Sequence, residues 1–236
     1  MKNIKALIVA AGRGRRLGNI TSKTPKPLVK VNGEPLIKRS IEILTGFGIN
    51  DITVVVGYKK EFVKQSLPKH IKYVSNPEFE CTNNLMSMYY GAKNITGSNF
   101  LYLHSDIWYD PRIIKKTLEQ TNNITFMVDE KICQEEEMKL KIKNNLVVEA
   151  DKNIPPSESI GEWLGIAKFS IEGGINYINE VNSVASPKNN SYDCSVVKNL
   201  YAKGININWS GIGEYPWIEI DFIEDLKEAE RLSKKT

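Results

Sequence analysis

The sequence predicts an α/β fold with a doubly wound, mostly parallel sheet. Three observations support this prediction. The continuous apolar run at residues 6–11 is typical of a strand that is buried on both faces. Further along the chain, strand-like runs alternate with helix-like segments through short loops, which is the pattern of parallel sheets. The first run also ends in a glycine-rich loop, and ligands of doubly wound sheets bind at the carboxyl ends of the strands.

The first half of the chain predicts strict alternation of strands and helices. The expected strands are 6–11, 52–56 and 71–74, and the expected helices are 36–44 and 60–66. Asn32-Gly33 predicts a tight turn before the first helix, which has apolar residues at helical spacing. This helix should end near Gly46 or Gly48, because glycine readily adopts the left-handed conformation that follows a helix.

The second half predicts further strands and a small β-rich insertion. The expected strands are 99–106, 124–129, 146–150 and 205–209, with helices from Asn84, at 113–120 and at 172–184. Within 159–169, two glycines bracket Glu162 and Trp163, and an apolar strand is expected after them. The charged stretch 135–143 predicts a solvated hairpin or loop, and 195–202 a packing element. A strand from Trp217 and a helix at 222–232 close the chain.

Composition limits the classes of function. The 236 residues are 41% hydrophobic, which is enough for one sizeable core, and no apolar run approaches the ~20 residues of a membrane span. The net charge of +4 is too small to predict general nucleic-acid binding. The three cysteines form no CxxC pair and the apolar run near the N-terminus is interrupted by glycine and arginine, so we expect no signal peptide and free thiols in a cytoplasmic protein.

The loop after the first strand is rich in glycine and basic residues. Gly12 and Gly14 lie among eight Lys and Arg residues that precede the first carboxylate, Glu34. Glycines let backbone amides approach phosphate oxygens and the cations neutralise their charge, so the loop predicts a polyphosphate site. The spacing does not match a P-loop, and Leu17 replaces the third small residue of a dinucleotide-binding fingerprint.

Two separated motifs in this region indicate a family. G-x-G-x-R-L, with Gly12, Gly14, Arg16 and Leu17, is followed by P-K-P-L at 25–28. Together they resemble the signature loop of nucleotidyltransferases of the sugar-1-phosphate and phosphocholine type, with an ordinary basic strand–helix loop as the alternative. The resemblance implies that Arg16 and the glycine amides bind the β- and γ-phosphates of a nucleotide. It also implies that Lys26 bridges the α-phosphate and the acceptor.

A second motif lies before the predicted helix at Asn84. Thr82 or Asn83 is expected to cap this helix. The pattern Asn83-Asn84-x-x-Ser87 also resembles the matching stretch of phosphocholine and aminophosphonate cytidylyltransferases, in which side-chain amides and hydroxyls read a pyrimidine. This resemblance favours CTP over UTP or dTTP, with a plain helix cap as the alternative.

Two aspartates follow predicted strands. The resemblance implies that Asp106 and Asp221 bind Mg²⁺, an ion that carboxylates hold against nucleotide phosphates, whereas capping is the alternative for each. Glu219 shares a strand face with Asp221 and is expected to assist it. His104 has no metal-binding residue at a suitable spacing, so we expect it to be an ordinary strand residue.

Acidic and aromatic residues of the second half form a hypothetical acceptor site. They are Asp129, Glu162, Trp163, Tyr192 and Asp193. Such groups suit a cationic acceptor through charge pairing and cation–π contacts. Their assembly is a hypothesis, because a sequence gives no distances, and surface positions for Glu162 and Trp163 are the alternative.

The resemblance covers nearly the whole chain and implies one nucleotidyltransferase domain, 1–236. We expect a Rossmann-like nucleotide-binding core at 5–128, an acceptor-side region at 129–213, and a closing strand and helix at 214–236. The nucleotide-binding residues that it implies are Ala10, Ala11, Gly12, Arg13, Gly14, Arg15, Arg16, Lys26, Thr82, Asn83, Asn84, Ser87 and Ser105. The catalytic residues are Arg16, Lys26, Asp106 and Asp221.

The implied activity is transfer of CMP from CTP to a small acceptor with release of pyrophosphate. The acceptor would be phosphocholine, 2-aminoethylphosphonate or a related phosphoramide or amine, in the synthesis of a surface polysaccharide or a phosphonate. An acceptor oxygen attacks the α-phosphorus in line, and the protein neutralises charge instead of supplying a nucleophile. No nucleic-acid or membrane partner is expected.

Two other classes of function are open. One is a sugar-1-phosphate nucleotidyltransferase that makes a nucleoside-diphosphate sugar, which would share the N-terminal loop and differ in the acceptor pocket. The other is a non-catalytic nucleotide-binding module. The joint presence of Lys26, Asp106 and Asp221 speaks against that module, because a binder has no use for a metal-and-lysine clamp at the α-phosphate.

Overall fold

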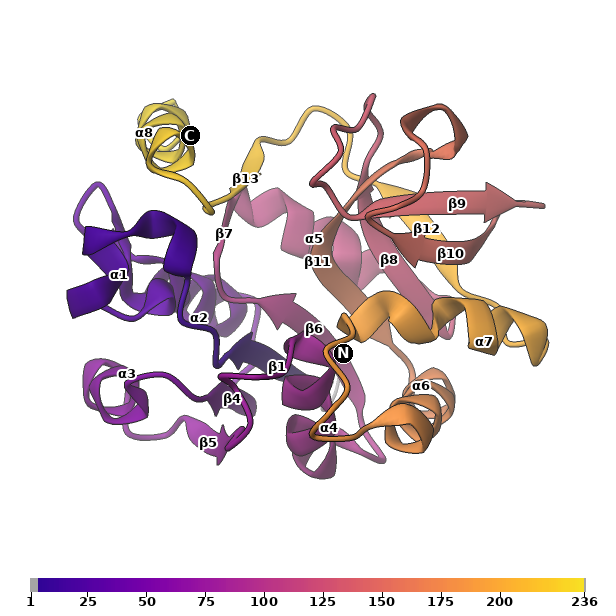
Figure 1. Cartoon of the computed structure of the whole chain (residues 1–236), viewed down its shortest axis with the longest axis horizontal. Helices are drawn as coiled ribbons and strands as arrows, with labels where there is room; N and C mark the ends of the chain where they lie inside the picture. Colours follow the sequence, from indigo (N-terminus) through magenta and orange to yellow (C-terminus); the bar gives the residue numbers. More distant parts are fainter. Residues whose placement is uncertain (1–3, 236) are drawn as a thin grey trace.

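A nine-stranded sheet runs through the molecule in a computed structural model that describes residues 4–235 (Figure 1). Its parallel half has the order β6-β1-β4-β5. These strands are β1 (Ile4–Ala10), β4 (Ile52–Val56), β5 (Lys72–Ser75) and β6 (Asn99–His104). Ala10 pairs with Val56, and Val9 pairs with His104. The loops after β1 and β6 therefore leave the sheet side by side.

The other half of the sheet is mainly antiparallel. β11 is antiparallel to β6, β8 and β9, whereas β12 runs parallel to β8. The strands are β8 (Ile124–Asp129), β9 (Lys139–Lys143), β10 (Leu146–Asp151), β11 (Gly161–Phe169) and β12 (Asn208–Gly211). Two small ribbons pair β2 (Lys30–Val31) with β3 (Glu34–Pro35), and β7 (Ile107–Tyr109) with β13 (Trp217–Glu219).

Helices cover both faces of the sheet, which explains the unbroken apolar sequence of β1. Ala6 and Ile8 join one buried cluster, with α2 (Leu36–Gly46), α3 (Lys60–Ser66) and α5 (Pro111–Glu119). Leu7 and Val9 join another cluster on the opposite face, with α4 (Asn84–Ile95), α6 (Ile171–Val184) and α7 (Val197–Ala202). Apolar surface is thus removed from water on both sides of the strand.

Two further helices complete the described chain. α1 (Asn19–Lys23) follows the glycine-rich loop, and α8 (Ile223–Leu232) lies near it at the upper left of Figure 1. Leu17 and Val31 from the N-terminal segment form a third apolar cluster with Ala229 of α8. The C-terminal helix is therefore packed against the N-terminal loops. None of the helices within residues 4–235 has the length and apolar character that crossing a bilayer requires.

The predicted fold class is confirmed, with local differences. The strand expected at 99–106 ends at His104, so that Ser105 and Asp106 leave the sheet edge, and β7 follows as a strand that was not predicted. The strand expected at 205–209 lies at 208–211. The tight turn at Asn32-Gly33 is confirmed by φ values of 48° and 89°, which a β-hairpin turn of this kind requires.

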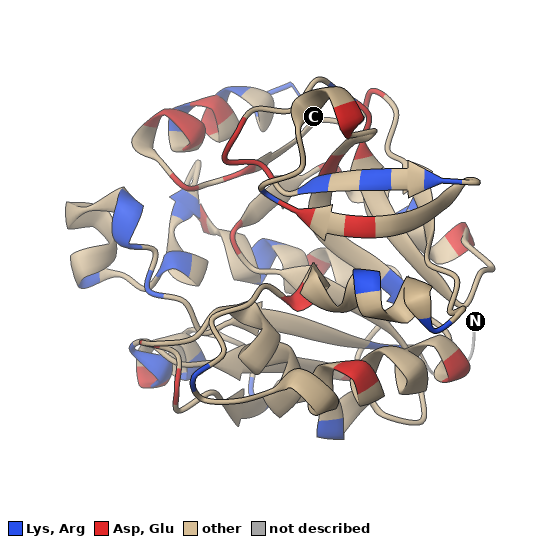
Figure 2. Cartoon of the chain, turned by 45° about the vertical axis from the view of Figure 1, so that its right-hand side comes forward, with Lys and Arg blue, Asp and Glu red and all other residues tan. Residues whose placement is uncertain are grey.

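The charged stretch at 135–143 enters the β9–β10 hairpin, where basic and acidic strands lie side by side (Figure 2). The prediction of a hairpin or loop is confirmed, but the expectation of a solvated stretch is wrong at Lys139. Its side chain is buried, and Nζ donates to the carbonyl oxygens of Glu135 and Lys152, each at 2.7 Å. Three backbone acceptors, the third from Glu137, replace the water that a lysine normally holds.

Candidate active site

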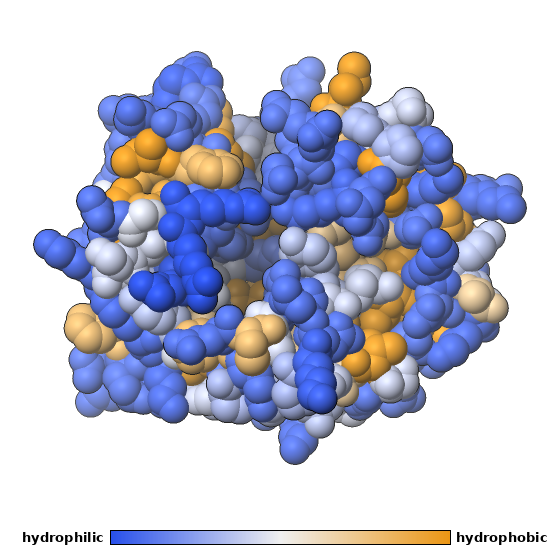
Figure 3. Space-filling view, viewed as in Figure 1, coloured by the Kyte–Doolittle hydropathy of each residue, from blue (hydrophilic) through white to orange (hydrophobic). Residues whose placement is uncertain are grey.

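A cavity of about 280 Å³ opens at the carboxyl ends of β1 and β6. Figure 3 shows a hollow near the centre of this face, with strongly hydrophilic side chains beside it over the N-terminal segment. Residues from both halves of the sheet line the cavity. They are Val9, Ala11, Gly12, Arg16, Lys26, Pro27, Asn76, Phe79, Thr82, Asn83, Asn84, Ser87, His104, Ser105, Asp106, Met138, Lys152, Trp163, Leu164, Tyr192, Asp193, Glu219 and Asp221.

The glycine-rich loop is shaped to admit a lysine side chain. Gly14 has φ +69°, and a Cβ atom there would lie 2.8 Å from Cβ and Cδ of Lys26. Thr21 fixes the same turn, since its hydroxyl donates to the carbonyl of Gly14 at 2.6 Å. Glycine is therefore required at this position both by the backbone angle and by the contact.

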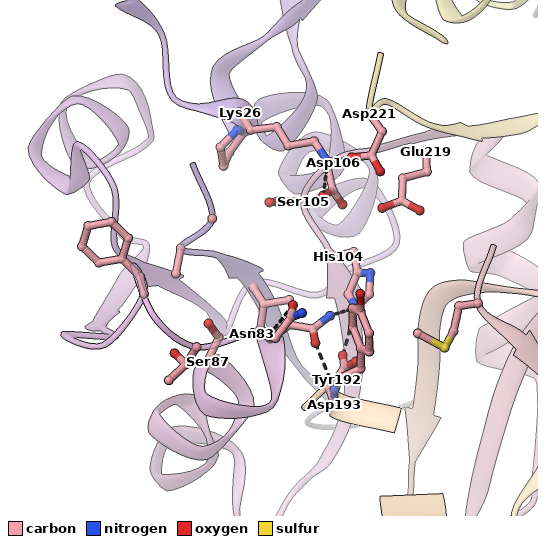
Figure 4. Close-up of a pocket in the computed structure, with 18 of the residues that line it drawn as sticks. Lys26, Asn83, Ser87, His104, Ser105, Asp106, Tyr192, Asp193, Glu219 and Asp221 are labelled. Carbon is pink, nitrogen blue, oxygen red and sulfur yellow. Dashed lines mark hydrogen bonds and ion pairs between the residues drawn. The ribbon is translucent and has the colours of Figure 1, made fainter. Parts of the chain in front are cut away.

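Lys26 joins two aspartates that are far apart in the sequence. Its Nζ lies 2.7 Å from Oδ2 of Asp106 and 2.6 Å from Oδ1 of Asp221 (Figure 4). Burial opposes the charge of Lys26, but Asp106, Glu219 and Asp221 together raise its pKa above the ordinary value. Although burial also disfavours its charge, Lys26 and His104 hold the pKa of Asp106 below its ordinary value. The contact between Lys26 and Asp106 therefore favours the charged form of both side chains.

The same carboxylates fit a divalent cation. Oδ1 of Asp106 is buried and has no hydrogen-bond partner among residues 4–235. Glu219 lines the cavity and its side chain is exposed there, while desolvation by the surrounding protein and repulsion from Asp106 raise its pKa to about 7. Within residues 4–235, three or more His, Cys, Asp or Glu side chains nowhere form a metal site. Two aspartates suffice for Mg²⁺ when phosphates supply further ligands.

Arg16 spans the mouth of the cavity. Its guanidinium lies 2.9 Å from Oδ2 of Asp221 and 3.1 Å from Oε2 of Glu136, which is an exposed residue of the loop before β9. Arg13 and Arg15 line a shallower adjoining depression together with Gly14. The basic loop thus faces the cavity and this depression, as a polyphosphate site requires.

The start of α4 forms the opposite wall. Asn83 is the N-cap of α4, as expected, and its side chain accepts from the backbone N of Asn84 at 3.0 Å. Thr82 instead donates to the carbonyl of Glu78 at 2.7 Å. Ser87 is buried, and its oxygen accepts from Nδ2 of Asn76 at 3.1 Å. Asn83 and Ser87 therefore lie together away from the Lys26 cluster, as Figure 4 shows.

A buried hydrogen-bonded network forms the floor of the cavity. Nε2 of His104 lies 2.9 Å from Oδ2 of Asp193, and the hydroxyl of Tyr102 donates to the same oxygen. Oδ1 of Asn84 accepts from the backbone N of Asp193 at 3.0 Å. Burial opposes the charge of His104, but Asp193 raises its pKa to about 9. The network ties β6 and α4 to the segment before α7, so His104 is more than an ordinary strand residue.

Three of the five predicted acceptor residues line the cavity, namely Trp163, Tyr192 and Asp193. Trp163 is buried and stacks on Phe126 with ring centroids 4.8 Å apart, while its Nε1 donates to the carbonyl of Ile166. The carboxylate of Asp193 is held by Tyr102 and His104. These side chains therefore already have protein partners.

Asp129 and Glu162 are not among the residues that line the cavity. They pair on neighbouring strands β8 and β11, and Lys131 lies 2.8 Å from Oε2 of Glu162 and 3.8 Å from Oδ2 of Asp129. Nε1 of Trp217 also donates to Asp129 at 3.1 Å. Both carboxylates are thus engaged by the protein's own donors.

Several residues that line the cavity were not predicted from the sequence. They are Val9, Pro27, Asn76, Phe79, Met138, Lys152, Leu164 and, as part of the cavity wall, His104. Lys152 adds a cation to Arg16 and Lys26, with Nζ 5.5 Å from the centroid of the Tyr192 ring. The Asp151-Lys152 pair after a short strand was visible in the sequence, but no motif marked it. Most of the predicted nucleotide-binding residues line the cavity, Ser105 among them, whereas Ala10 is a core residue beside it.

Comparison with known proteins gives a family match in the N-terminal half. The model of the MobA-like NTP transferase domain matches residues 6–135. This range includes the glycine-rich loop, the start of α4 and Asp106. It covers more than half of the chain.

Three curated relatives add to this match. CTP:phosphoglutamine cytidylyltransferase of Campylobacter jejuni is 26% identical, with 95% of this chain aligned to 98% of that protein. Choline-phosphate cytidylyltransferase of Streptococcus pneumoniae is 43% identical over 40% of this chain and 42% of its own length. The CMP-5'-(3-aminopropyl)phosphonate synthase of Streptomyces rubellomurinus is 33% identical over 48% of this chain, but only 19% of that protein is aligned. The match therefore spans less than half of the last two relatives.

Solved structures agree with the fold. The inositol-1-phosphate CTP transferase from T. maritima superposes with a TM-score of 0.81 over 99% of this chain and 96% of its own, at 22% identity. At this identity, the likeness supports the architecture and not a substrate. The strand order and helix layers described above are therefore those of a known nucleotidyltransferase structure.

Proposed function

The chain belongs to the MobA-like NTP transferase family, and from this premise we propose that it is a cytidylyltransferase. In this proposal it transfers CMP from CTP to a small phosphorylated or phosphonate acceptor and releases pyrophosphate. The observation that carries the proposal is the contact of Lys26 with Asp106 and Asp221 beside the glycine-rich loop. The names of the cytidylyltransferase relatives support CTP as the donor and a phosphorylated or phosphonate compound as the acceptor.

The nucleotide would occupy the end of the cavity between the glycine-rich loop and the start of α4. Arg16 and the amides of Gly12 and Gly14 would bind the β- and γ-phosphates, because cations and backbone N–H groups suit phosphate oxygens. Asn83 and Ser87 would meet the base. Asn83 and Ser87 lie apart from Lys26 in Figure 4, which supports an extended nucleotide.

The chemical step depends on neutralising charge. Lys26 would contact both the α-phosphate and the attacking acceptor oxygen, so that its ammonium group stabilises the negative charge that grows as they approach. Asp106 and Asp221 would hold Mg²⁺, which when bound neutralises phosphate oxygens. The unpartnered Oδ1 of Asp106 supports this assignment. The protein supplies no covalent nucleophile, since positioning and electrostatics suffice for transfer of a phosphoryl group.

The acceptor would bind at the opposite end, near Lys152, Tyr192 and Met138. Lys152 would pair with the acceptor phosphate or phosphonate and bring it towards Lys26. A small acceptor body would then contact Tyr192, Trp163 and Met138. Because Asp129 and Glu162 are paired with Lys131, the positive group of a cationic acceptor would pair with the carboxylate of Glu219.

A sugar-1-phosphate acceptor is the less favoured alternative. A hexose needs several amide and carboxylate groups to hydrogen-bond its hydroxyls, and at this end of the cavity Met138, Leu164 and Trp163 are apolar, while Asp193 is already paired. A non-catalytic nucleotide-binding module is also less favoured. Binding alone does not need a buried lysine shared by two aspartates, which costs desolvation energy.

The test is pyrophosphate release with Mg²⁺ across a grid of substrates. One axis is CTP, UTP, dTTP, ATP and GTP, and the other is phosphocholine, 2-aminoethylphosphonate, other small phosphorylated amines or amides, glycerol phosphate and hexose-1-phosphates. We expect signal with CTP and a small phosphorylated or phosphonate acceptor. Signal only with a hexose-1-phosphate would replace the proposal by the sugar alternative, and CTP binding without any turnover would favour the binding module.

A further inference from the structure

Asn76 and Ser87 form a buried pair in the wall of the cavity, at the end assigned to the nucleotide. Nδ2 of Asn76 donates to Oγ of Ser87 at 3.1 Å, and the two residues are only 2% and 4% exposed. Asn76 lies just after β5, whereas Ser87 is in the first turn of α4. The pair thus links two elements at the place where a base would lie beside Phe79.

The orientation of the Asn76 amide is fixed by the backbone. Its Oδ1 accepts from the N–H of Glu78 at 2.9 Å, and its own N–H donates to the carbonyl of Val56 at 2.9 Å. Exchanging the amide oxygen and nitrogen would set an NH₂ group against the N–H of Glu78. The nitrogen must therefore face Ser87.

This orientation also fixes the role of the Ser87 hydroxyl. A serine hydroxyl has one hydrogen to donate, and its oxygen can accept. The oxygen is engaged by Asn76, and within residues 4–235 Ser87 donates to no protein acceptor. Because Ser87 lines the cavity, its hydrogen is available to a ligand there.

We propose that Asn76 is a positioning residue that makes the Ser87 hydroxyl a donor and so selects cytosine over uracil. This inference rests on the proposed function. Cytosine presents an acceptor at N3, whereas uracil presents an N–H at the same position, so the two bases differ in what the hydroxyl meets. With uracil, the Ser87 hydroxyl hydrogen would face the N–H at position 3 instead of an acceptor, and two buried donors that face each other are costly.

The direct test is Asn76→Asp, with kcat/KM for CTP and UTP measured by pyrophosphate release at pH 8. The substitution keeps an oxygen for the N–H of Glu78 but replaces the NH₂ group by an acceptor. The Ser87 hydroxyl would then donate to the new carboxylate and offer its lone pair to the base. We expect the ratio of kcat/KM for CTP to that for UTP to fall by about tenfold or more, with a gain for UTP.

A second variant keeps the inference testable if Asn76→Asp does not fold. Ser87→Ala should lower kcat/KM for CTP by about tenfold and change the value for UTP much less. Asn50→Asp, which makes the same change at an exposed position of a distant loop, is the matched control and should leave the ratio unchanged.

The experiments separate a failure of the role of Asn76 from a failure of the proposed function. A merely structural role for Asn76 would lower the values for CTP and UTP alike, and an unchanged ratio in Ser87→Ala would overturn the inference while wild-type CTP turnover upheld the proposed function. If the wild-type chain transferred nothing from CTP, the proposed function would fall, and the inference with it.

Discussion

The side chain of Lys26 lies directly against the backbone of Gly14. A Cβ atom at Gly14 would come within 2.9 Å of three side-chain carbons of Lys26, and the turn has φ +69°. The glycine-rich loop thus packs along the Lys26 side chain, whose Nζ contacts Asp106 and Asp221. This contact connects the two motifs through residues that are twelve positions apart in the sequence, Gly14 and Lys26.

Gly14→Ala should therefore displace Lys26 as well as strain the loop. We expect a loss of about 1–3 kcal/mol in the free energy of unfolding and a fall of tenfold or more in kcat/KM. Gly12→Ala is the matched control for stability, because nothing lies within 4 Å of a Cβ at Gly12. Thermal or chemical unfolding of both variants gives the comparison. Equal stability of the two variants would contradict the packing of Lys26 on Gly14.

Removing the charge of Lys26 should abolish most of the turnover. Lys26→Ala is expected to lower kcat by 100-fold or more, which is the usual loss when a donor that stabilises transition-state charge is removed. Lys26→Met separates charge from packing, since methionine keeps an unbranched apolar chain against Gly14, and it should be as inactive as Lys26→Ala. Lys30→Ala, at an exposed position nearby, should retain wild-type turnover. Near-wild-type turnover in Lys26→Met would refute the assignment.

Asp106→Ala should remove the metal dependence of nucleotide binding. In the wild type, we expect CTP to bind more tightly with Mg²⁺ than with EDTA, because Asp106 and the phosphates share the ion. In the variant, calorimetric titrations with Mg²⁺ and with EDTA should give similar dissociation constants. Asp51→Ala provides the control, since Asp51 pairs with Lys72 at the far end of β4. A metal effect that survives in Asp106→Ala would exclude Asp106 as a ligand.

Much of the fold and part of the site follow from local sequence. The apolar runs of β1, β4 and β6 predict parallel strands, and such strands end at one edge, where the structure places Gly12 and Asp106 beside the same cavity. The predicted resemblance to nucleotidyltransferases is confirmed by the family match over residues 6–135. These signals are local because strand periodicity and loop motifs are read within a few residues.

The acceptor side could not be predicted in the same way. The register of β8 and β11 brings Asp129 beside Glu162, but a side chain from the following loop, Lys131, neutralises both. Lys152 enters the cavity only because the β9–β10 hairpin returns towards Tyr192. Such contacts depend on which charged side chain lies nearest to a carboxylate in the folded protein. No spacing in the sequence indicates which side chain that is.

The free energy of unfolding should depend on pH through Glu162. Burial raises the pKa of this carboxyl to about 7, although Lys131 opposes the shift. The unfolded chain releases the proton near pH 4.5 and the folded chain near pH 7, so the free energy of unfolding falls as pH rises between these values. Glu162→Gln removes this decline. The free energy of unfolding of the variant minus that of the wild type should therefore increase by up to about 3 kcal/mol from pH 4.5 to 8.

Urea unfolding of both proteins at pH 4.5, 5.5, 7 and 8 measures this difference. Other titrating groups are common to the two proteins, so they cancel in the subtraction except where Glu162 itself influences them. Parallel curves for variant and wild type would show that Glu162 has an ordinary pKa. The loss of the contact with Lys131 shifts the variant's curve as a whole and does not change the sign of its slope.

Lys152 should act on the acceptor and not on the nucleotide. Its Nζ lies near the Tyr192 ring, and its nearest carboxylate is Glu136 at 3.9 Å, an exposed residue that is shared with Arg16. A water-exposed pair of this length is weak, so Lys152 can exchange Glu136 for an acceptor phosphate. Lys152→Ala should raise the KM for the acceptor by about tenfold and leave the KM for CTP within about twofold.

Lys143→Ala is the matched control for this prediction, because Lys143 is exposed at the tip of the same hairpin. The backbone carbonyl of residue 152 still accepts from buried Lys139 in the alanine variant, so the hairpin is expected to keep its fold. Steady-state kinetics with each substrate varied in turn separate the two KM values. If Lys152→Ala raised the KM for CTP instead, Lys152 would bind the triphosphate, and the acceptor would have to enter from the side of Glu219.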